Sequence, residues 1–194
     1  MDKIRVKSML LVLLALLAPI IGASAATAAG KKSVKADTLT SYQETPATLA
    51  SSATGSFSAD IDEGAAIITY ELRYSGLTTA ATAAHIHFGG RFLSGGVSAF
   101  LCGGGSKPAC PEGTTTEAVV TGTITAADIV GPAAQGIAAG DLEELLRAIW
   151  AGVTYANVHS TTFPGGQPRL PVCPPPQGRT PNRCRGSLPT PWSP

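Results

Sequence analysis

Charged residues are scarce in this chain of 194 residues: Lys, Arg, Asp and Glu make up 14% of it, and the formal net charge is +1. A nucleic-acid-binding surface needs clustered lysine and arginine, so the composition argues against one. Common catalytic motifs are missing as well. The chain contains neither the G-x-S-x-G elbow of serine hydrolases nor a phosphate-binding loop that leads into a helix. Its four cysteines include no C-x2-C pair of the kind that binds structural zinc.

No apolar run is long enough for an ordinary membrane-spanning helix. The main run covers residues 9–21, whereas such a helix needs roughly 20 residues. Three basic residues precede this run, and the small residues Gly22-Ala23-Ser24-Ala25-Ala26 follow it. This order is typical of a secretory signal cleaved near Ala25. We therefore expect residues 1–25 to be a signal peptide, the mature protein to be secreted, and contact with a membrane to be limited to export. An uncleaved membrane anchor is the alternative.

Cleavage after residue 25 would leave 11 basic and 12 acidic residues, a nearly neutral protein. In an exported protein, cysteines favour disulfides over metal thiolates. Cys102 and Cys110 flank a Gly-rich segment that can close on itself, and Cys173 and Cys184 flank a Pro-rich one. Four cysteines allow three pairings, of which we predict the local one, Cys102–Cys110 with Cys173–Cys184.

Aromatic residues make up only 6% of the chain, and a helical pattern occurs once. The predicted helix covers residues 141–150, where Asp141 can cap the helix start and Glu144 completes a capping box. Short segments that alternate apolar and polar residues, separated by Gly-rich turns, predict strands. The expected strands are residues 37–41, 55–61, 65–74, 85–87, 97–101, 118–124 and 153–160. This pattern predicts an all-β fold, a Greek-key or immunoglobulin-like β-sandwich or barrel with one short helix.

The composition changes at both ends of this predicted β domain. Residues 26–36 are small and polar and include lysines, so we expect a flexible leader. Prolines become frequent after Gly166 and remove backbone donors. We therefore place the domain at residues 37–170 and an extended Pro/Arg-rich tail at residues 171–194.

Several separated segments resemble the CHRD domain, first described in chordin, and its secreted bacterial members in particular. These segments are Gln43-Glu44-Thr45-Pro46, residues 69–77, Ala84-His85-Ile86-His87, residues 100–102 and 109–111, residues 122–129, residues 149–159 and Phe163-Pro164-Gly165-Gly166. The resemblance covers about residues 36–169. It implies an immunoglobulin-like β-barrel or sandwich, distantly similar to Cu/Zn superoxide dismutase. It implies no particular reaction, and the growth-factor partner of chordin does not transfer to this chain.

The last motif departs from the family. Members that this chain resembles have G-E-I/L-R, whereas this chain has Gly166-Gln167-Pro168-Arg169. A proline has no amide hydrogen to donate to a β-ladder, which predicts that the final strand is not properly paired. A frameshift or a truncated gene from about residue 167 would explain the departure, and sequencing the locus tests this. On that hypothesis the protein is a degenerate copy.

All three histidines lie in two of the expected strands, at His85, His87 and His159. Residues two apart in a strand point to the same face, so His85 and His87 can bind one ion. If the strand of His159 is a neighbour, the three nitrogens form a site for copper or zinc. Two other interpretations stay open. Each imidazole bonds a nearby carbonyl or carboxylate and has a structural role only, or the histidines act as acid–base groups.

Two functions are compatible with these observations. The first is a secreted, non-enzymatic binding or structural module for an unknown protein or other extracellular ligand. The second is a copper- or zinc-binding protein that uses His85, His87 and His159, with redox activity if the ion is copper. The sequence predicts no catalytic residue, and copper or zinc is the only cofactor that it suggests.

Overall fold

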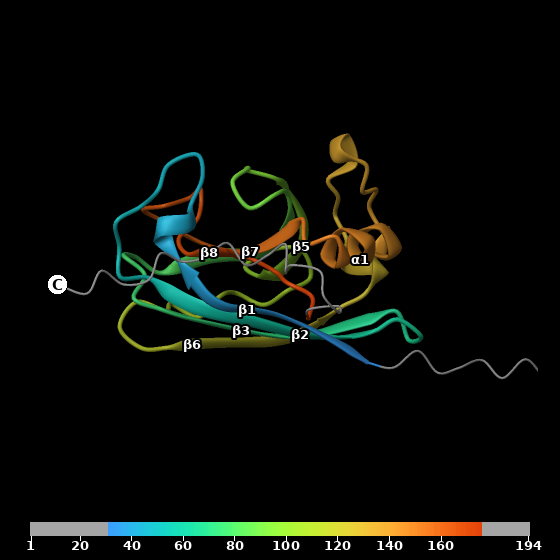
Figure 1. The fold of residues 1–194 in the computed structure, drawn as a ribbon. Coiled ribbons are helices and arrows are strands. Elements are labelled where there is room, and N and C mark those ends of the chain that lie inside the picture. The colour runs from blue at the N-terminus through green and yellow to red at the C-terminus, as the bar shows by residue number, and fades with distance from the viewer. Residues whose placement is uncertain (1–30, 176–194) are drawn as a thin grey trace, which may run out of the picture.

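Eight β-strands form one antiparallel sheet in the computed structural model, which describes residues 31–175 (Figure 1). The strands are β1 (Lys32–Thr40), β2 (Thr54–Asp62), β3 (Ile67–Ser75), β4 (Ala81–Phe88), β5 (Gly96–Cys102), β6 (Ala118–Ile124), β7 (Thr154–Ser160) and β8 (Arg169–Pro171). Their order in the sheet is β5-β4-β7-β8-β1-β2-β3-β6. The two end strands, β5 and β6, contact each other, so the sheet curls into a nearly closed barrel. The all-β prediction is confirmed.

Alternation of side chains along the strands fills the barrel. In β3, every second residue is apolar or aromatic and at most 3% exposed, and these are Ile68, Tyr70, Leu72 and Tyr74. The residues between them point outward. Since side chains in a strand alternate between the two faces of a sheet, this period of two places one row in the core and one row in solvent.

One α-helix, α1 (Leu142–Trp150), packs at one end of the barrel (Figure 1). The carboxylate of Asp141 accepts a hydrogen bond from the backbone N–H of Glu144 at 3.0 Å, which satisfies an amide of the first turn. Leu142, Leu145 and Ile149 are buried. Three short 3-10 helices, η1 (Ser41–Gln43), η2 (Ala126–Asp128) and η3 (Ala133–Gln135), lie in the connections. Within residues 31–175, no helix is both long and apolar enough to cross a membrane.

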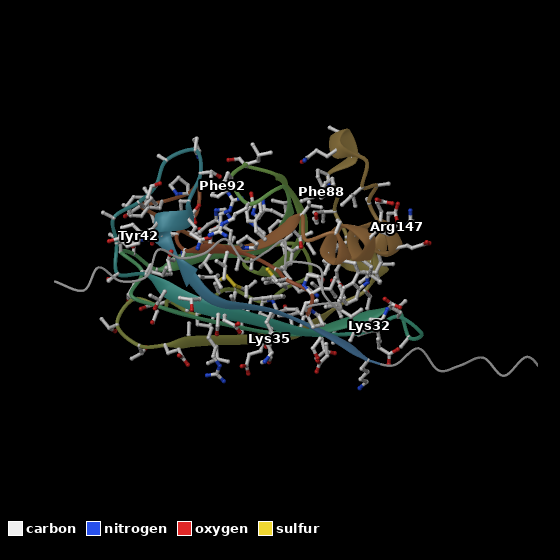
Figure 2. All side chains as sticks on the ribbon, viewed as in Figure 1. Lys32, Lys35, Tyr42, Phe88, Phe92 and Arg147 are labelled. Atoms are coloured by element: carbon white, nitrogen blue, oxygen red, sulfur yellow. A yellow bond between two sulfur atoms is a disulfide. The ribbon has the colours of Figure 1, made fainter. Side chains whose placement is uncertain are left out.

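The sheet begins five residues earlier than expected. β1 starts at Lys32, so residues 32–36 of the expected leader belong to the barrel. Val34 and Ala36 are buried, and Lys35, labelled in Figure 2, is exposed on the outer face of the sheet. Lys32 is on the same side of the strand as Val34 and Ala36, and at the end of the barrel its ammonium pairs with Glu63 and lies 5.2 Å from the Trp150 ring. The lysines suggested a flexible segment, but Lys35 occupies a solvent-facing position of an alternating strand and Lys32 pairs with Glu63 at the end of the barrel.

The sheet also ends later than expected, and the prediction of an unpaired last strand is corrected. β8 pairs with β7 on one side and with β1 on the other. Pro168 tolerates this position because the ladder uses its carbonyl, which accepts from the backbone N–H of Val158 at 3.1 Å. Beyond β8, Cys173 and Lys35 exchange two backbone hydrogen bonds at 2.9 and 3.0 Å. The first residues of the expected tail therefore pair with the barrel. The frameshift hypothesis stays a prediction for sequencing.

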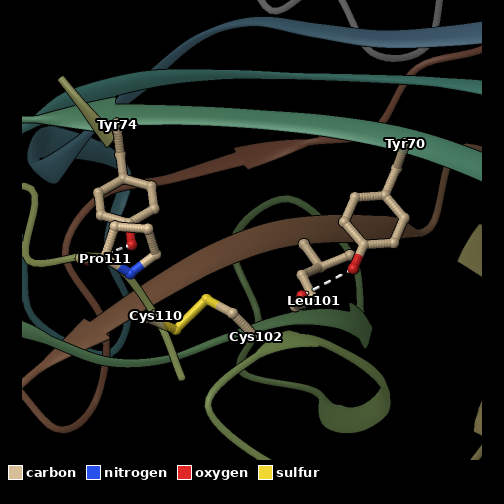
Figure 3. The surroundings of a disulfide bond; sticks show 6 residues. All are labelled: Tyr70, Tyr74, Leu101, Cys102, Cys110 and Pro111. Carbon is tan, nitrogen blue, oxygen red and sulfur yellow. Dashed lines mark hydrogen bonds between the residues drawn. A yellow bond between two sulfur atoms is a disulfide. The ribbon is translucent and has the colours of Figure 1, made fainter. Parts of the chain in front are cut away.

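A disulfide joins Cys102 and Cys110, as predicted (Figure 3). Two tyrosines of β3 attach this region to the opposite wall of the barrel. The hydroxyl of Tyr70 donates to the carbonyl of Leu101 at 2.7 Å, and that of Tyr74 donates to the carbonyl of Pro111 at 2.6 Å.

Other predictions fall on residues outside the described range. Cys184, the expected partner of Cys173, is among them. So are the expected signal peptide and most of the Pro/Arg-rich tail.

Candidate metal centre

The strand register brings the three histidines to one face of the sheet. β4 and β7 are antiparallel neighbours, in which His85 lies opposite Asn157 and His87 lies opposite Tyr155. His159 lies two residues beyond Asn157 and shares its face. Residues directly opposite each other in an antiparallel pair point the same way. The condition set by the sequence, that the two histidine-bearing strands are neighbours, is therefore met.

The barrel core occupies the other face of the same two strands. Ala84, Ile86, Ala156 and Val158 are at most 2% exposed and belong to the hydrophobic core. The histidines point away from this core and are covered by connecting loops, so that they are only 7–9% exposed. In Figure 2, the loops that carry Tyr42 and Phe92 lie on the side of β7 and β8 away from β1, β2 and β3.

The three imidazoles are close enough to share one ion. One nitrogen from each of His85, His87 and His159 lies within 4.8 Å of the other two. The ring centroids are 4.7 Å apart for His85 and His159, 5.3 Å for His85 and His87, and 5.6 Å for His87 and His159. Phe100 contacts His85 edge to face at 4.5 Å and forms an apolar side of the cluster.

Two backbone carbonyls determine which nitrogens are available. Nδ1 of His87 lies 3.0 Å from the carbonyl oxygen of Gly95, and Nδ1 of His159 lies 2.9 Å from that of Pro164. A carbonyl oxygen only accepts, so each Nδ1 must carry the hydrogen, which leaves a lone pair on each Nε2. Metal-ligating histidines in proteins are typically oriented in this way.

The two lone pairs point at each other. Nε2 of His87 lies 3.4 Å from Nε2 of His159. Two lone pairs at this distance repel unless a proton or a metal ion lies between them. Two nitrogens that bind one zinc ion at tetrahedral geometry, each about 2.05 Å from it, are themselves about 3.4 Å apart. The separation of this pair matches that geometry, whereas the three nitrogens together lie within 4.8 Å, so His85 must move closer to bind the same ion.

His85 has buried nitrogens with no partner. Neither its Nδ1 nor its Nε2 makes a hydrogen bond with the described residues, although both are inaccessible to solvent. Leaving a buried polar atom without a partner is costly. The structural interpretation, in which each imidazole bonds a neighbouring carbonyl, therefore fits His87 and His159 but does not account for His85.

Burial keeps the three imidazoles neutral. Burial, with a smaller contribution from neighbouring imidazoles, lowers the pKa of His85 to about 3 and that of His87 to about 4. Burial also lowers the pKa of His159. A metal ion binds the neutral imidazole only, so no proton competes for these nitrogens near neutral pH. A proton placed between Nε2 of His87 and Nε2 of His159 would form one hydrogen bond. A metal ion bound by all three histidines would form three coordinate bonds.

A second layer of residues, which the sequence did not predict, supports the histidines. The ring of Tyr155 is parallel to that of His87, within 3°, at 4.8 Å. The guanidinium of Arg169 lies 3.5 Å from the centroid of the same tyrosine ring. Because β7 lies between β4 and β8, Tyr155 lies between His87 and Arg169.

Glu44 and Asn157 complete this layer. The side-chain N–H of Asn157 donates to Glu44 at 3.5 Å and to the carbonyl of Gly165 at 3.4 Å. Burial raises the pKa of Glu44 to about 7, and the charge of Arg169 opposes this rise. Among the described residues, Oε1 of Glu44 and Oδ1 of Asn157 have no hydrogen-bond partner. The site is therefore continuous with a buried polar region.

A comparison with known protein families matches residues 36–169 to the CHRD domain. No curated protein and no solved structure matches the chain.

Proposed function

Because the chain belongs to the CHRD-domain family, we propose that it is a non-enzymatic binding module of that family whose ligand is a transition-metal ion. His85, His87 and His159 are the proposed ligands. We also propose that the protein acts outside the cytoplasm, on the basis of the signal-like residues 1–25.

The observation that carries this proposal is the state of the imidazole nitrogens. Two Nε2 atoms face each other at 3.4 Å with their Nδ1 atoms already committed to carbonyls. The third histidine has two buried nitrogens with no partner. One metal ion would remove the lone-pair repulsion and satisfy a nitrogen of His85 at the same time.

The donor set favours zinc or copper. Three neutral imidazoles, with no carboxylate or thiolate in the group, suit either ion. The Irving–Williams order favours copper(II) where both are present. Three protein ligands leave a fourth position open for water or another small ligand. Copper would add redox activity, and zinc would not.

Metal titration tests the proposal. The full chain is made metal-free with EDTA, dialysed, and titrated with copper(II) or zinc while heat and bound metal are measured. We expect one ion per chain, and loss of binding in His85→Ala, His87→Ala and His159→Ala. The chain has only three histidines, so these variants cover every imidazole.

A cysteine variant is the matched control. Cys173→Ser with Cys184→Ser removes the two cysteine sulfurs outside the Cys102–Cys110 disulfide and is expected to keep one ion per chain. Absence of stoichiometric metal on the wild-type chain, or equal binding after all three histidines are replaced, would overturn the proposal.

A second candidate ligand is a protein or other apolar extracellular partner. Three large apolar side chains on the loops over the site are exposed: Tyr42 by 66%, Phe92 by 78% and Leu93 by 66%. Thr45 and Ser94 join these two loops by a hydrogen bond at 3.2 Å. Exposed apolar surface that gathers in one place is typical of an interaction site.

Binding of a dye that fluoresces on apolar surfaces tests whether these side chains form one patch. The variant Phe92→Ser with Leu93→Ser is expected to reduce the fluorescence strongly. The control Val119→Ser with Val130→Ser replaces exposed apolar residues elsewhere and should have little effect. Equal effects would exclude a localised patch.

A further inference from the structure

Arg169 is a buried cation with an unusual set of contacts. It is 1% exposed, although arginine is rarely buried unless it is paired. Its guanidinium donates to the carbonyls of Gly90 at 3.0 Å and Leu93 at 2.7 Å, and to the hydroxyl of Thr45. Glu44 lies close enough to Arg169 for its carboxyl group to favour the charged guanidinium. One side chain of β8 thus joins two separate loops.

The first connection from Arg169 to the histidine cluster runs through the loop of residues 89–95. Arg169 binds two carbonyls of this loop, and Gly95 lies two residues beyond the second. The Gly95 carbonyl accepts from Nδ1 of His87, and its N–H donates to the hydroxyl of Tyr155 at 2.9 Å. A Cβ at Gly95 would overlap the carbonyl of Phe88, so the loop returns directly onto β4. The position of this loop therefore decides which nitrogen of His87 carries the hydrogen.

The second connection runs through Tyr155. Its ring contacts the guanidinium of Arg169 and is parallel to the imidazole of His87. A planar cation on an aromatic ring is held by the charge distribution of the ring and is stronger where solvent is excluded. Arg169 thereby holds the ring that supports His87.

We infer that Arg169 is a positioning residue for His87: it holds the loop of residues 89–95 and the ring of Tyr155, and these two hold the imidazole with Nε2 directed at the other histidines. Arg169 contacts no ion itself. The inference rests on the proposed function for its effect on metal affinity, but its effect on His87 exists without metal.

The test replaces Arg169 by Lys and by Met. Lysine keeps the charge but cannot form the same planar fork of hydrogen bonds or stack on the ring, whereas methionine removes the charge. Arg147→Lys, on the exposed surface of α1, is the matched control. Two readouts are used: nitrogen NMR of the histidine rings in metal-free protein, and the affinity for copper(II) or zinc.

We expect His87 in the wild-type chain to carry its hydrogen on Nδ1 and both Arg169 variants to populate the Nε2–H form. His159 should keep its state in every variant, because its partner, the Pro164 carbonyl, lies on another loop. A purely structural role of Arg169 would change thermal stability without changing His87 alone. Metal affinity should fall about 10-fold or more, as for other residues that orient a ligand.

The results separate this inference from the proposed function. If Arg169→Lys leaves the state of His87 and the metal affinity unchanged, the inference is overturned, even if the wild-type chain binds metal. If the wild-type chain binds no metal but His87 still responds, the inference holds and the proposed function fails. If neither variant folds, Tyr155→Phe, which removes the acceptor for the Gly95 N–H, must also raise the Nε2–H fraction of His87. An unchanged His87 there would overturn the inference.

Discussion

We expect the free energy of unfolding of the metal-free protein to fall between pH 6.5 and pH 5. The fall should be larger in the Glu44→Gln variant than in the wild-type chain. The pKa values of His85 and His87 are about 3 and about 4, because burial disfavours the charged imidazole, whereas an unperturbed histidine titrates near 6.5. The folded pKa lies below the unfolded one, so the unfolded chain takes up protons first as the pH falls below 6.5. Each of these histidines therefore lowers the free energy of unfolding as the pH falls below 6.5.

The magnitude follows from linkage between proton binding and folding. Between pH 6.5 and 5, His85 and His87 each lower the free energy of unfolding by about 1.5 kcal/mol. Burial raises the pKa of Glu44 to about 7, so its protonation favours the folded state by about 1.5 kcal/mol over the same range. The net loss is about 1.5 kcal/mol, and about 3 kcal/mol in Glu44→Gln, where the opposing group cannot titrate. His159, whose pKa burial also lowers, adds to both losses.

Urea unfolding at pH 6.5 and at pH 5, followed by circular dichroism in EDTA, measures both losses. This range lies above the ordinary pKa of carboxylic acids, so other acidic groups contribute little. Glu44→Gln keeps an oxygen that can accept from the Asn157 side chain, and its urea dependence should match that of the wild-type chain. A free energy of unfolding that is unchanged or higher at pH 5 in Glu44→Gln would refute the claim that the imidazoles are buried and neutral.

Three substitutions test the surrounding structure by thermal or urea unfolding. Gly166→Ala should destabilise by about 2 kcal/mol or more and weaken metal binding, because Gly166 has φ of 126° and an added Cβ would overlap the Asn157 side chain; unchanged stability would contradict this packing. Tyr70→Phe should cost about 1–2 kcal/mol, since it leaves a buried carbonyl of β5 without its donor; a neutral effect would mean that water replaces the hydroxyl. Replacing Cys102 and Cys110 together by Ser should lower the free energy of unfolding by about 2–3 kcal/mol, because the disulfide no longer restricts the unfolded chain. Reduction of the disulfide in the wild-type chain should lower it by the same amount, and a smaller effect of reduction would contradict this explanation.

Local patterns of the sequence were sufficient for most of the fold. The alternation in residues 65–74 predicted β3, and the helical pattern with Asp141 as its cap predicted α1. The spacing of His85 and His87 gave their shared face directly. The assumption that the His159 strand is a neighbour was needed to bring the third histidine to them, and the register confirms it.

The second layer could not be predicted, because its residues meet only through the order of the strands. Glu44 and Arg169 lie far apart in the chain, and the sequence placed each only in a separate motif. They come together because β8 inserts between β7 and β1. That insertion itself was missed, since Pro168 was judged by its absent N–H, whereas the ladder uses its carbonyl.

The division of β4 and β7 into an apolar inner row and a histidine-bearing outer row has an evolutionary consequence. Substitution of an outward-facing residue such as His85 leaves the hydrophobic core contacts of Ile86 and Val158 intact. A lineage can therefore acquire, retune or discard the ion-binding residues without rebuilding the scaffold that presents them. The same separation makes the domain a practical starting point for grafting other ligand sets onto these two strands.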